Sequence, residues 1–340
     1  YVADQFAHLG NAYRQSLGDD VKAIECYRRS LTVDLAHEGA RRGLKELLDQ
    51  ESTRNVAAEA MVHSLRTSGD LIGLLEIVDA RLAGTEDQRK HAEILRESAD
   101  IAEAQANDAT AALGFITRLF PLEARDRVLE ERMLRLASEV GDSDSCLAAY
   151  AKAEEALGDD AYAVAQMRFR EAIFRDEIVG DRVGALQCCL QVIATLPDNH
   201  EAVAKTLQFA GPDGKFDDMV AALLAYASER DSIPEDLISS TIGFANDAEA
   251  WASLCAAMSQ RVPDCGLQAR HQAELQWRIS GWQLEQLGDA QAALQSLLLS
   301  TQLDNTRVDT QRKLAELQAG SRDAALYATF RRLCEIESDE

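Results

Sequence analysis

A short turn signature that returns along the chain is the feature that most restricts its fold. Each copy has an aspartate after a turn, an alanine four residues later and an aliphatic residue five residues later. A small residue stands nine positions before the aspartate, where one helix can approach another closely. The clear copies are Gly10/Asp19/Ala23/Ile24, Ala99/Asp108/Ala112/Leu113, Ala172/Asp181/Ala185/Leu186 and Ser280/Asp289/Ala293/Leu294. The signature predicts helical hairpins, which bury their apolar faces by stacking on one another.

Weaker turn marks of the same type extend this pattern. Together with the clear copies they fall at Asp19, Asp70, Asp108, Asp142, Asp181, Asp217, Asp247, Asp289 and Ser321. Their mean spacing of about 38 residues is typical of two-helix repeats. A Gly or Asn before most marks suits a left-handed helix C-cap, and the aspartate suits the N-cap of the next helix. These preceding residues are Gly18, Gly69, Asn107, Gly141, Gly180 and Gly288. We therefore expect each mark to end one helix and begin the next.

The composition indicates an all-α chain. It contains 5 Pro and 9 Phe in 340 residues, and no stretch alternates apolar and polar residues over the length of a strand. The marks predict about eight or nine helix-turn-helix repeats in one continuous solenoid over residues 1–340. We expect irregular hairpins near residues 35–55 and 209–247. Because Tyr1 already lies in a helical pattern, we interpret the chain as a fragment of a longer protein.

The charge and the cysteines restrict the partners and the compartment. The formal charge of -23 opposes binding to nucleic acid, whose affinity comes largely from Lys and Arg. The same charge attracts basic peptides or protein faces, although exposed acids also serve solubility. The 7 cysteines show no CxxC spacing and resemble reduced core residues, which favours the cytoplasm. No apolar run reaches the roughly 18 residues of a membrane helix, so we expect no membrane insertion.

The first repeat carries a more detailed pattern than the others. Its Leu9-Gly10, Tyr13, Ala23, Tyr27, Ser30 and Asp34 follow one another at intervals that resemble those of the tetratricopeptide repeat. The match needs one extra residue in the turn at Gly18 to Asp20, and Leu35 replaces the usual closing proline. Over the whole chain, the looser signature is similar to that of long bacterial tetratricopeptide-like arrays. This resemblance implies a right-handed superhelix whose concave wall, lined by first helices, binds peptides or proteins.

The resemblance also implies candidate binding residues. In that family, groove residues lie one, four and five positions after the small residue. Carried over to this chain, with one tryptophan that precedes a small residue, the partner-binding candidates are Asn11, Arg14, Gln15, Asp100, Glu103, Asp176, Glu177, Trp277 and Glu285. The acids among them predict a concave acidic groove for a basic or amphipathic segment. Such acids are equally typical of the solvated face of an amphipathic helix.

Partial matches to catalytic motifs lack the required residues. His200-Glu201 begins like an HExxH zinc helix but has no second histidine. The turn from Gly211 to Lys215 has two residues between its glycines, too few for a phosphate loop. Adjacent Cys188 and Cys189 are predicted to pack in the core. The sequence therefore predicts no enzyme, no metal and no cofactor.

These observations predict a non-catalytic scaffold for a peptide or protein partner. Three alternatives stay open. The first is a regulatory or sensor repeat domain of a larger protein that carries an enzyme elsewhere. The second is a structural subunit of a homo-oligomeric assembly. The third is an enzyme with a carboxylate pair in the groove, which would be marked by raised carboxylate pKa values in one deep pocket.

Overall fold

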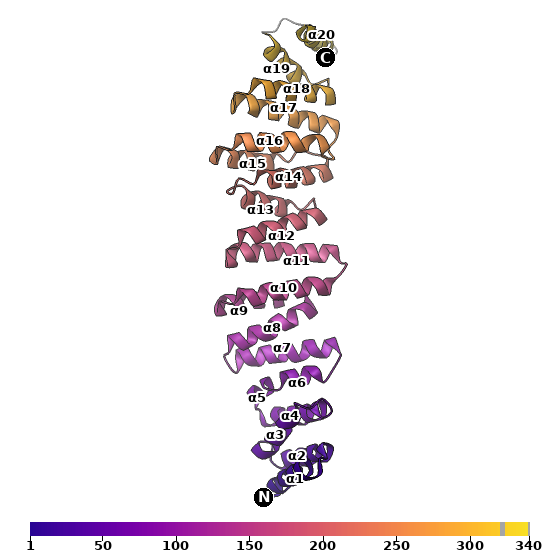
Figure 1. Ribbon diagram of the computed structural model, residues 1–340, viewed down its shortest axis with the longest axis vertical. Coiled ribbons are helices and arrows are strands. Elements are labelled where there is room, and N and C mark those ends of the chain that lie inside the picture. The colour runs from indigo at the N-terminus through magenta and orange to yellow at the C-terminus, as the bar shows by residue number, and fades with distance from the viewer. Residues whose placement is uncertain (320–323, 339–340) are drawn as a thin grey trace. The chain divides into compact units, whose positions relative to one another are not determined.

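The computed structural model describes residues 1–319 and 324–338 (Figure 1). These residues form 20 α-helices, a few short π- and 3-10 helices, and no strand. Contacts within the chain divide it into two compact units, Tyr1–Asp159 (unit 1) and Asp160–Glu340 (unit 2). Each unit has its own apolar core, which contains Tyr27 and Leu44 in unit 1 and Phe216 and Leu254 in unit 2.

Unit 1 consists of five consecutive hairpins. The first helices are α1 (Val2–Ala12, continued by a π-helical turn Tyr13–Leu17), α3 (Glu38–Leu47), α5 (Leu71–Leu75), α7 (Gln88–Ala104) and α9 (Arg127–Val140). The second helices are α2 (Asp20–Val33), α4 (Arg54–Ser68), α6 (Val78–Ala83), α8 (Ala109–Leu119, continued by a 3-10 turn Phe120–Glu123) and α10 (Ser143–Leu157). Each second helix from α2 to α8 packs against the first helix of the next hairpin, and α4 also contacts α2 and α6.

Unit 2 has the same organisation. Its first helices are α11 (Ala161–Phe174, continued by a π-helical turn Arg175–Val179), α13 (His200–Ala210), α15 (Glu235–Asp247), α17 (Ala269–Glu285) and α19 (Val308–Gln318). Its second helices are α12 (Arg182–Thr195), α14 (Phe216–Arg230), α16 (Trp251–Arg261, continued by a 3-10 turn Val262–Asp264), α18 (Ala290–Leu303) and α20 (Ala324–Ser338). Again each second helix from α12 to α18 packs on the following first helix. The predicted all-α fold of stacked helical hairpins is therefore confirmed within each unit.

The described residues contain more hairpins than the turn marks predict. The marks miss the turn between α3 and α4 and the short hairpin of α5 and α6, because neither turn carries a glycine followed by a capping aspartate. Residues 35–55 hold α3 and the start of α4, and residues 209–247 hold α14, α15 and the end of α13. The shortest described α-helices are α5 and α6. A single array over residues 1–340 stays a prediction.

Six of the marks act as the sequence predicts. Asp19, Asp70, Asp108, Asp142, Asp181 and Asp289 are N-caps, and each carboxylate accepts a hydrogen bond from the backbone N–H three residues later. The preceding glycine or asparagine has a positive φ at every one of these turns, from 51° at Asn107 to 77° at Gly141. Glycine reaches this left-handed region at little cost, which explains its repeated use there.

Two further marks lie at turns between helices, as predicted, but their aspartates are not N-caps, and one mark lies outside the described residues. Asp217 lies in the first turn of α14, whose N-cap is Lys215, because the left-handed residue of that turn is Gly214. Asp247 is the last residue of α15, because there the left-handed residue is Glu249. Ser321 lies outside the described residues. At these two turns the left-handed residue does not directly precede the marked aspartate, in contrast to the six capping marks.

In the four clear copies of the signature, the first helix ends in a turn that is closed by a hydrogen bond across six residues. The backbone N–H of Asp19 donates to the carbonyl of Tyr13, six residues earlier, at 3.0 Å. Asp108, Asp181 and Asp289 make the same six-residue closure. At Asp70 and Asp142 the corresponding N–H reaches a carbonyl five residues earlier. The extra residue in the tetratricopeptide-like pattern is therefore accommodated in this six-residue turn at the end of the first helix. Among the described helix pairs, the four hairpins with this closure have the most extensive contacts.

Loss of one cap is expected to weaken unit 1 in a pH-dependent way. The hydroxyl and backbone N–H of Ser145 donate to the Asp142 carboxylate at 2.6 and 3.1 Å and hold its pKa below the usual value. Asp142→Ala should lower the free energy of unfolding by about 1 kcal/mol at neutral pH. A lowered folded pKa stabilises above the unfolded pKa of about 3.9, and this contribution is lost as the pH falls through the folded value. Urea unfolding followed by circular dichroism at several pH values checks this, with Asp142→Asn as a capping control that does not titrate.

Candidate interaction surface

Ion pairs join the first helices of successive hairpins. In unit 1, Arg14 at the end of α1 pairs with Glu46 of α3. In unit 2, His200 of α13 lies 2.7 Å from Asp236 of α15, and Glu235 of α15 lies 2.5 Å from Arg278 of α17. These pairs connect residues about one repeat apart in the sequence. The surface made by the first helices thus carries charges of both signs.

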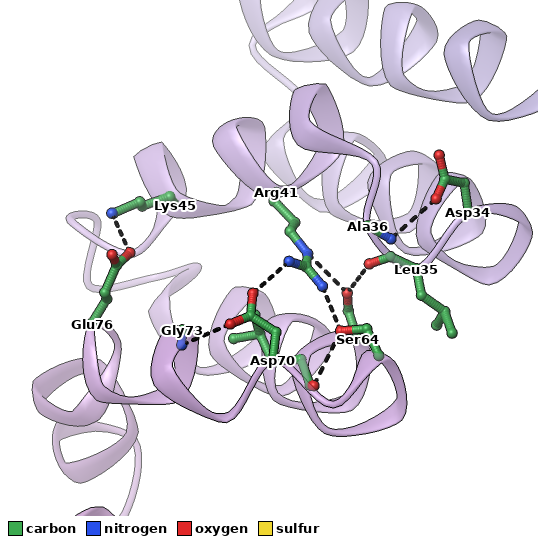
Figure 2. A network of polar contacts seen from close by, with 11 residues as sticks. Asp34, Leu35, Ala36, Arg41, Lys45, Ser64, Asp70, Gly73 and Glu76 are labelled. Atoms are coloured by element: carbon green, nitrogen blue, oxygen red, sulfur yellow. Dashed lines mark hydrogen bonds and ion pairs between the residues drawn. The ribbon is translucent and has the colours of Figure 1, made fainter. Parts of the chain in front are cut away.

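A related network fixes α3 to the next hairpin (Figure 2). The Arg41 guanidinium donates to Asp70 at 2.8 Å, to the Ser68 hydroxyl at 2.7 Å and to the Ser64 hydroxyl at 3.3 Å. Asp70 also accepts the backbone N–H of Gly73 and so caps α5. One half-buried cation therefore connects α3, α4 and the start of α5. The same site shows how a capping aspartate can serve two hairpins.

The candidates of the first hairpin are used largely within unit 1. The Asn11 side-chain oxygen accepts a hydrogen bond of 2.7 Å from the hydroxyl of fully buried Tyr27. Arg14 is half-buried in its pair with Glu46. Gln15 is exposed. A partner that approaches this hairpin would meet Gln15 directly and would compete for Asn11 and Arg14.

The acids of α7 face cations of α9. Arg132 lies 2.7 Å from Asp100 and 2.9 Å from Glu103, and Arg135 also pairs with Glu103. Burial alone would raise the pKa of Glu103, but the hydrogen bonds from Arg135 and Arg132 outweigh it and hold the pKa below its usual value. Glu103 is therefore ionised at neutral pH, and both carboxylates are engaged by the neighbouring hairpin.

The acids of the third clear copy differ from these. Asp176 and Glu177 lie in the π-helical turn that continues α11. Asp176 is half-buried and Glu177 is exposed. Within the part of the chain that the structure describes, neither carboxylate forms an ion pair. Their negative charge is therefore not offset by a neighbouring hairpin, in contrast to that of Asp100 and Glu103.

Trp277 of α17 lies close to Arg307, the N-cap of α19, and to Lys313 in α19. The Arg307 guanidinium carbon lies 5.4 Å and the Lys313 ammonium nitrogen 5.6 Å from the centre of the Trp277 ring. Cations at this distance are attracted to the face of an aromatic ring. Lys313 also lies 4.0 Å from Glu285. The indole N–H of Trp277 is buried and has no hydrogen-bond partner among the described residues.

The candidates taken from the resemblance therefore include the acid or the tryptophan of each contact but not the cation that it pairs with. The cations Arg132, Arg135, Arg307 and Lys313 were not among the candidates. They lie on the first helix of the hairpin that follows, roughly one repeat after the acid or aromatic residue that they contact. A search at the repeat spacing for cations opposite the acids and the tryptophan would have found them.

The remaining motifs are structural in this fold. His200 begins α13 and contacts Asp236. Burial raises the pKa of Cys188 to about 11 and that of Cys189 to about 12, so both are thiols at neutral pH. Across residues 1–319 and 324–338, no three His, Cys, Asp or Glu side chains are grouped to hold a metal ion. In the same part of the chain, no helix combines the length and apolar character needed to cross a bilayer.

Comparison with known proteins gives structural matches alone. No family model matches the chain, and no curated protein matches it. Similar solved chains include one from a Naa15/Naa10 complex bound to HypK-THB, with 15% identity, a TM-score of 0.31, and coverage of 98% of this chain and 53% of that one. This chain thus spans about half the length of that match.

Two further matches have similar levels of identity. A chain of the APC/C hetero-tetramer Cut9-Hcn1 is 13% identical, with a TM-score of 0.25 and coverage of 99% of this chain and 74% of that one. A protein from Parabacteroides merdae is 11% identical, with a TM-score of 0.25 and coverage of 94% and 99%. The latter is described as a tetratricopeptide repeat protein, the family that the first hairpin of this chain resembles in sequence.

Proposed function

We propose that this chain is a non-catalytic protein-interaction scaffold that binds a basic or amphipathic peptide segment on its first helices. Stacked hairpins repeat a first-helix surface along each unit, which is how repeat proteins present extended binding surfaces. The excess of acids over bases speeds the encounter with a basic partner. The contacts with the partner then depend on which acids are not already paired with a cation of this chain.

The availability of Asp176 and Glu177 carries the proposal. Asp100 and Glu103 are engaged by arginines of α9, so a basic partner would have to displace those arginines. Asp176 and Glu177 form no ion pair with another described residue, so a lysine or arginine can approach them without that cost. We therefore place the main charged contact of unit 2 on the π-helical turn of α11.

The position of Trp277 gives it a secondary role. Arg307 and Lys313 already lie near this ring, so a cationic partner side chain would compete with them for it. Glu285 is likewise shared with Lys313. We propose that Trp277 and Glu285 contribute less to affinity than Asp176 and Glu177.

A charge-reversal experiment tests this function. The probe is a fluorescein-labelled peptide of alternating lysine and leucine, titrated into the full chain and followed by fluorescence anisotropy. Asp176→Lys combined with Glu177→Lys is expected to weaken binding roughly tenfold, since two favourable charge contacts become repulsive. Affinity should also fall as the salt concentration rises.

A matched variant separates a local contact from the effect of net charge. Asp198→Lys combined with Glu229→Lys changes the net charge equally at two exposed positions of unit 2 outside the candidate set. This control should weaken binding much less than the Asp176/Glu177 variant. Equal weakening by both variants, or binding that does not respond to salt, would contradict the proposed contact.

A further inference from the structure

A cavity lies in unit 1 between the second helices α4 and α6 and the first helix α7. Its volume is about 410 Å³, and its walls come from α4, α6 and the first turns of α7. This size is within the usual range for sites that bind small molecules. None of the partner-binding candidates predicted from the sequence lines it. The proposed peptide contacts therefore do not involve this cavity.

The most informative residue of its wall is Arg81 of α6. The Arg81 side chain is 8% exposed, and its Nη2 atom donates to a carboxylate oxygen of Glu97 at 2.5 Å. Its other terminal nitrogen, Nη1, is buried and has no hydrogen-bond partner among the described residues. A buried N–H donor without an acceptor is costly, because it has given up its hydrogen bonds to water. A side chain that lines the cavity therefore has a donor that an additional acceptor would stabilise.

Positive charge predominates around this donor. Arg66 of α4 and Lys90 of α7 also line the cavity. Arg66 lies 2.7 Å from Glu97, so one carboxylate is shared between two guanidinium groups. Glu59 is the acid in the wall, and the exposed Lys90 pairs with no described carboxylate. Three cations thus exceed two carboxylates in a chain whose net charge is -23.

Glu97 does not cancel the charge of both arginines. Burial would raise its pKa, but the hydrogen bonds from Arg81 and Arg66 outweigh burial and hold the pKa below its usual value. Glu97 therefore carries one negative charge at neutral pH, opposite two guanidinium groups. The remaining positive charge faces the cavity together with Lys90.

Part of the wall is apolar, and Asn55, His63 and Thr85 add polar groups to it. Ala58 and Val62 of α4, Ala80 of α6 and Ile94 of α7 line the cavity beside the cations. Apolar side chains next to fixed charges suit a ligand with an acidic head and a short hydrocarbon body. An inorganic anion would leave the apolar part of the wall unused.

We propose that this cavity binds a small amphipathic anion, whose carboxylate or phosphate pairs with Arg81 and Lys90 and whose aliphatic body lies along Val62 and Ile94. Arg81 supplies a guanidinium already held in place by Glu97, and a charge-assisted hydrogen bond to such a group is stronger than one between neutral groups. The site is formed by the second helices α4 and α6 and by the N-terminal part of the first helix α7, and none of the first-helix candidates lines it.

Calorimetric titration of the full chain with hexanoate, hexyl phosphate and hexylammonium tests the proposal. Hexanoate, hexyl phosphate or both should bind at a single saturable site, and the stronger binder identifies the acidic head. Hexylammonium should not bind. Arg81→Gln is expected to weaken anion binding at least roughly tenfold, because the ligand loses a buried charged partner. Arg118→Gln removes a guanidinium that pairs with Asp79 outside the cavity and should leave binding unchanged.

A second variant keeps the test decisive if Arg81→Gln disturbs the fold. Lys90 is exposed at the start of α7, so Lys90→Glu should fold normally and should still weaken anion binding by repulsion. Absence of anion binding to the unaltered chain would overturn the proposal. Equal affinity for hexylammonium, or full affinity of a folded Lys90→Glu variant, would also overturn it.

Discussion

Replacing Tyr27 with alanine is expected to lower the free energy of unfolding of unit 1 by roughly 3–5 kcal/mol. Tyr27 is fully buried in α2, and its ring packs against two helical glycines, Gly10 of α1 and Gly43 of α3. A Cβ atom at Gly10 would lie 2.6 Å from the ring, which shows how closely the helices approach. The substitution removes this ring and the hydrogen bond from its hydroxyl to Asn11.

The two units can be followed separately in this experiment. All 3 tryptophans, Trp251, Trp277 and Trp282, lie in unit 2. Tryptophan fluorescence therefore reports unfolding of unit 2, while hydrogen exchange measured by mass spectrometry reports the amides of α1 to α3. We expect faster exchange of those amides in Tyr27→Ala. Protection equal to that of the unaltered chain would show that the ring does not hold the first two hairpins together.

A double-mutant cycle with Gly43 separates close packing from general destabilisation. In the unaltered chain, a Cβ at Gly43 would overlap the Tyr27 ring, so Gly43→Ala should cost about 1–3 kcal/mol. In the Tyr27→Ala background the methyl group has room, and alanine is favoured over glycine in a helix by up to about 1 kcal/mol. The sign of the Gly43→Ala effect should therefore reverse. An equal cost in both backgrounds would contradict the packing described here.

The second large effect is expected at a buried carboxylate of unit 1. Glu130 of α9 is 2% exposed, and the hydroxyl of buried Tyr150 in α10 donates to it at 2.8 Å. Tyr150→Phe should lower the free energy of unfolding by roughly 1–3 kcal/mol, because it removes a donor to a buried acceptor. The substitution retains the edge-to-face contact between the ring at position 150 and that of Phe120, whose centroids lie 5.5 Å apart in the unaltered chain.

The Glu130→Gln variant is the matched control for this prediction. It keeps an acceptor for the Tyr150 hydroxyl and removes the charge. If the hydrogen bond matters most, Tyr150→Phe should cost less in the Glu130→Gln background than in the unaltered chain, because the acceptor is then neutral. Urea unfolding followed by circular dichroism measures all four free energies. Unchanged stability of Tyr150→Phe would contradict the prediction.

The fold was predictable because its main signals are local. A glycine with positive φ and the aspartate after it act within a few residues, so six N-caps, from Asp19 to Asp289, could be read from the sequence. At the turns near Asp217 and Asp247 the left-handed residues are instead Gly214 and Glu249, so these two aspartates lie inside α14 and α15.

The interaction surface was predictable only in part, because its contacts join different hairpins. The positions of Asp100 and Glu103 follow from the repeat, but their neutralisation by Arg132 and Arg135 depends on how α9 packs beside α7. The cavity was not predictable for the same reason. Arg81 lies in a helix of six residues without the signature, and its buried nitrogen becomes apparent only when α4, α6 and α7 are assembled.

The two kinds of helix end have a consequence for how such a chain can change in length. Five- and six-residue closures occur in the same protein, and both deliver a left-handed residue followed by a capping aspartate. A residue can therefore be gained or lost just before the turn while the next helix keeps its starting point. An insertion or deletion of one residue at such a helix end therefore leaves the spacing between hairpins unchanged. Neighbouring repeats then need not change their packing.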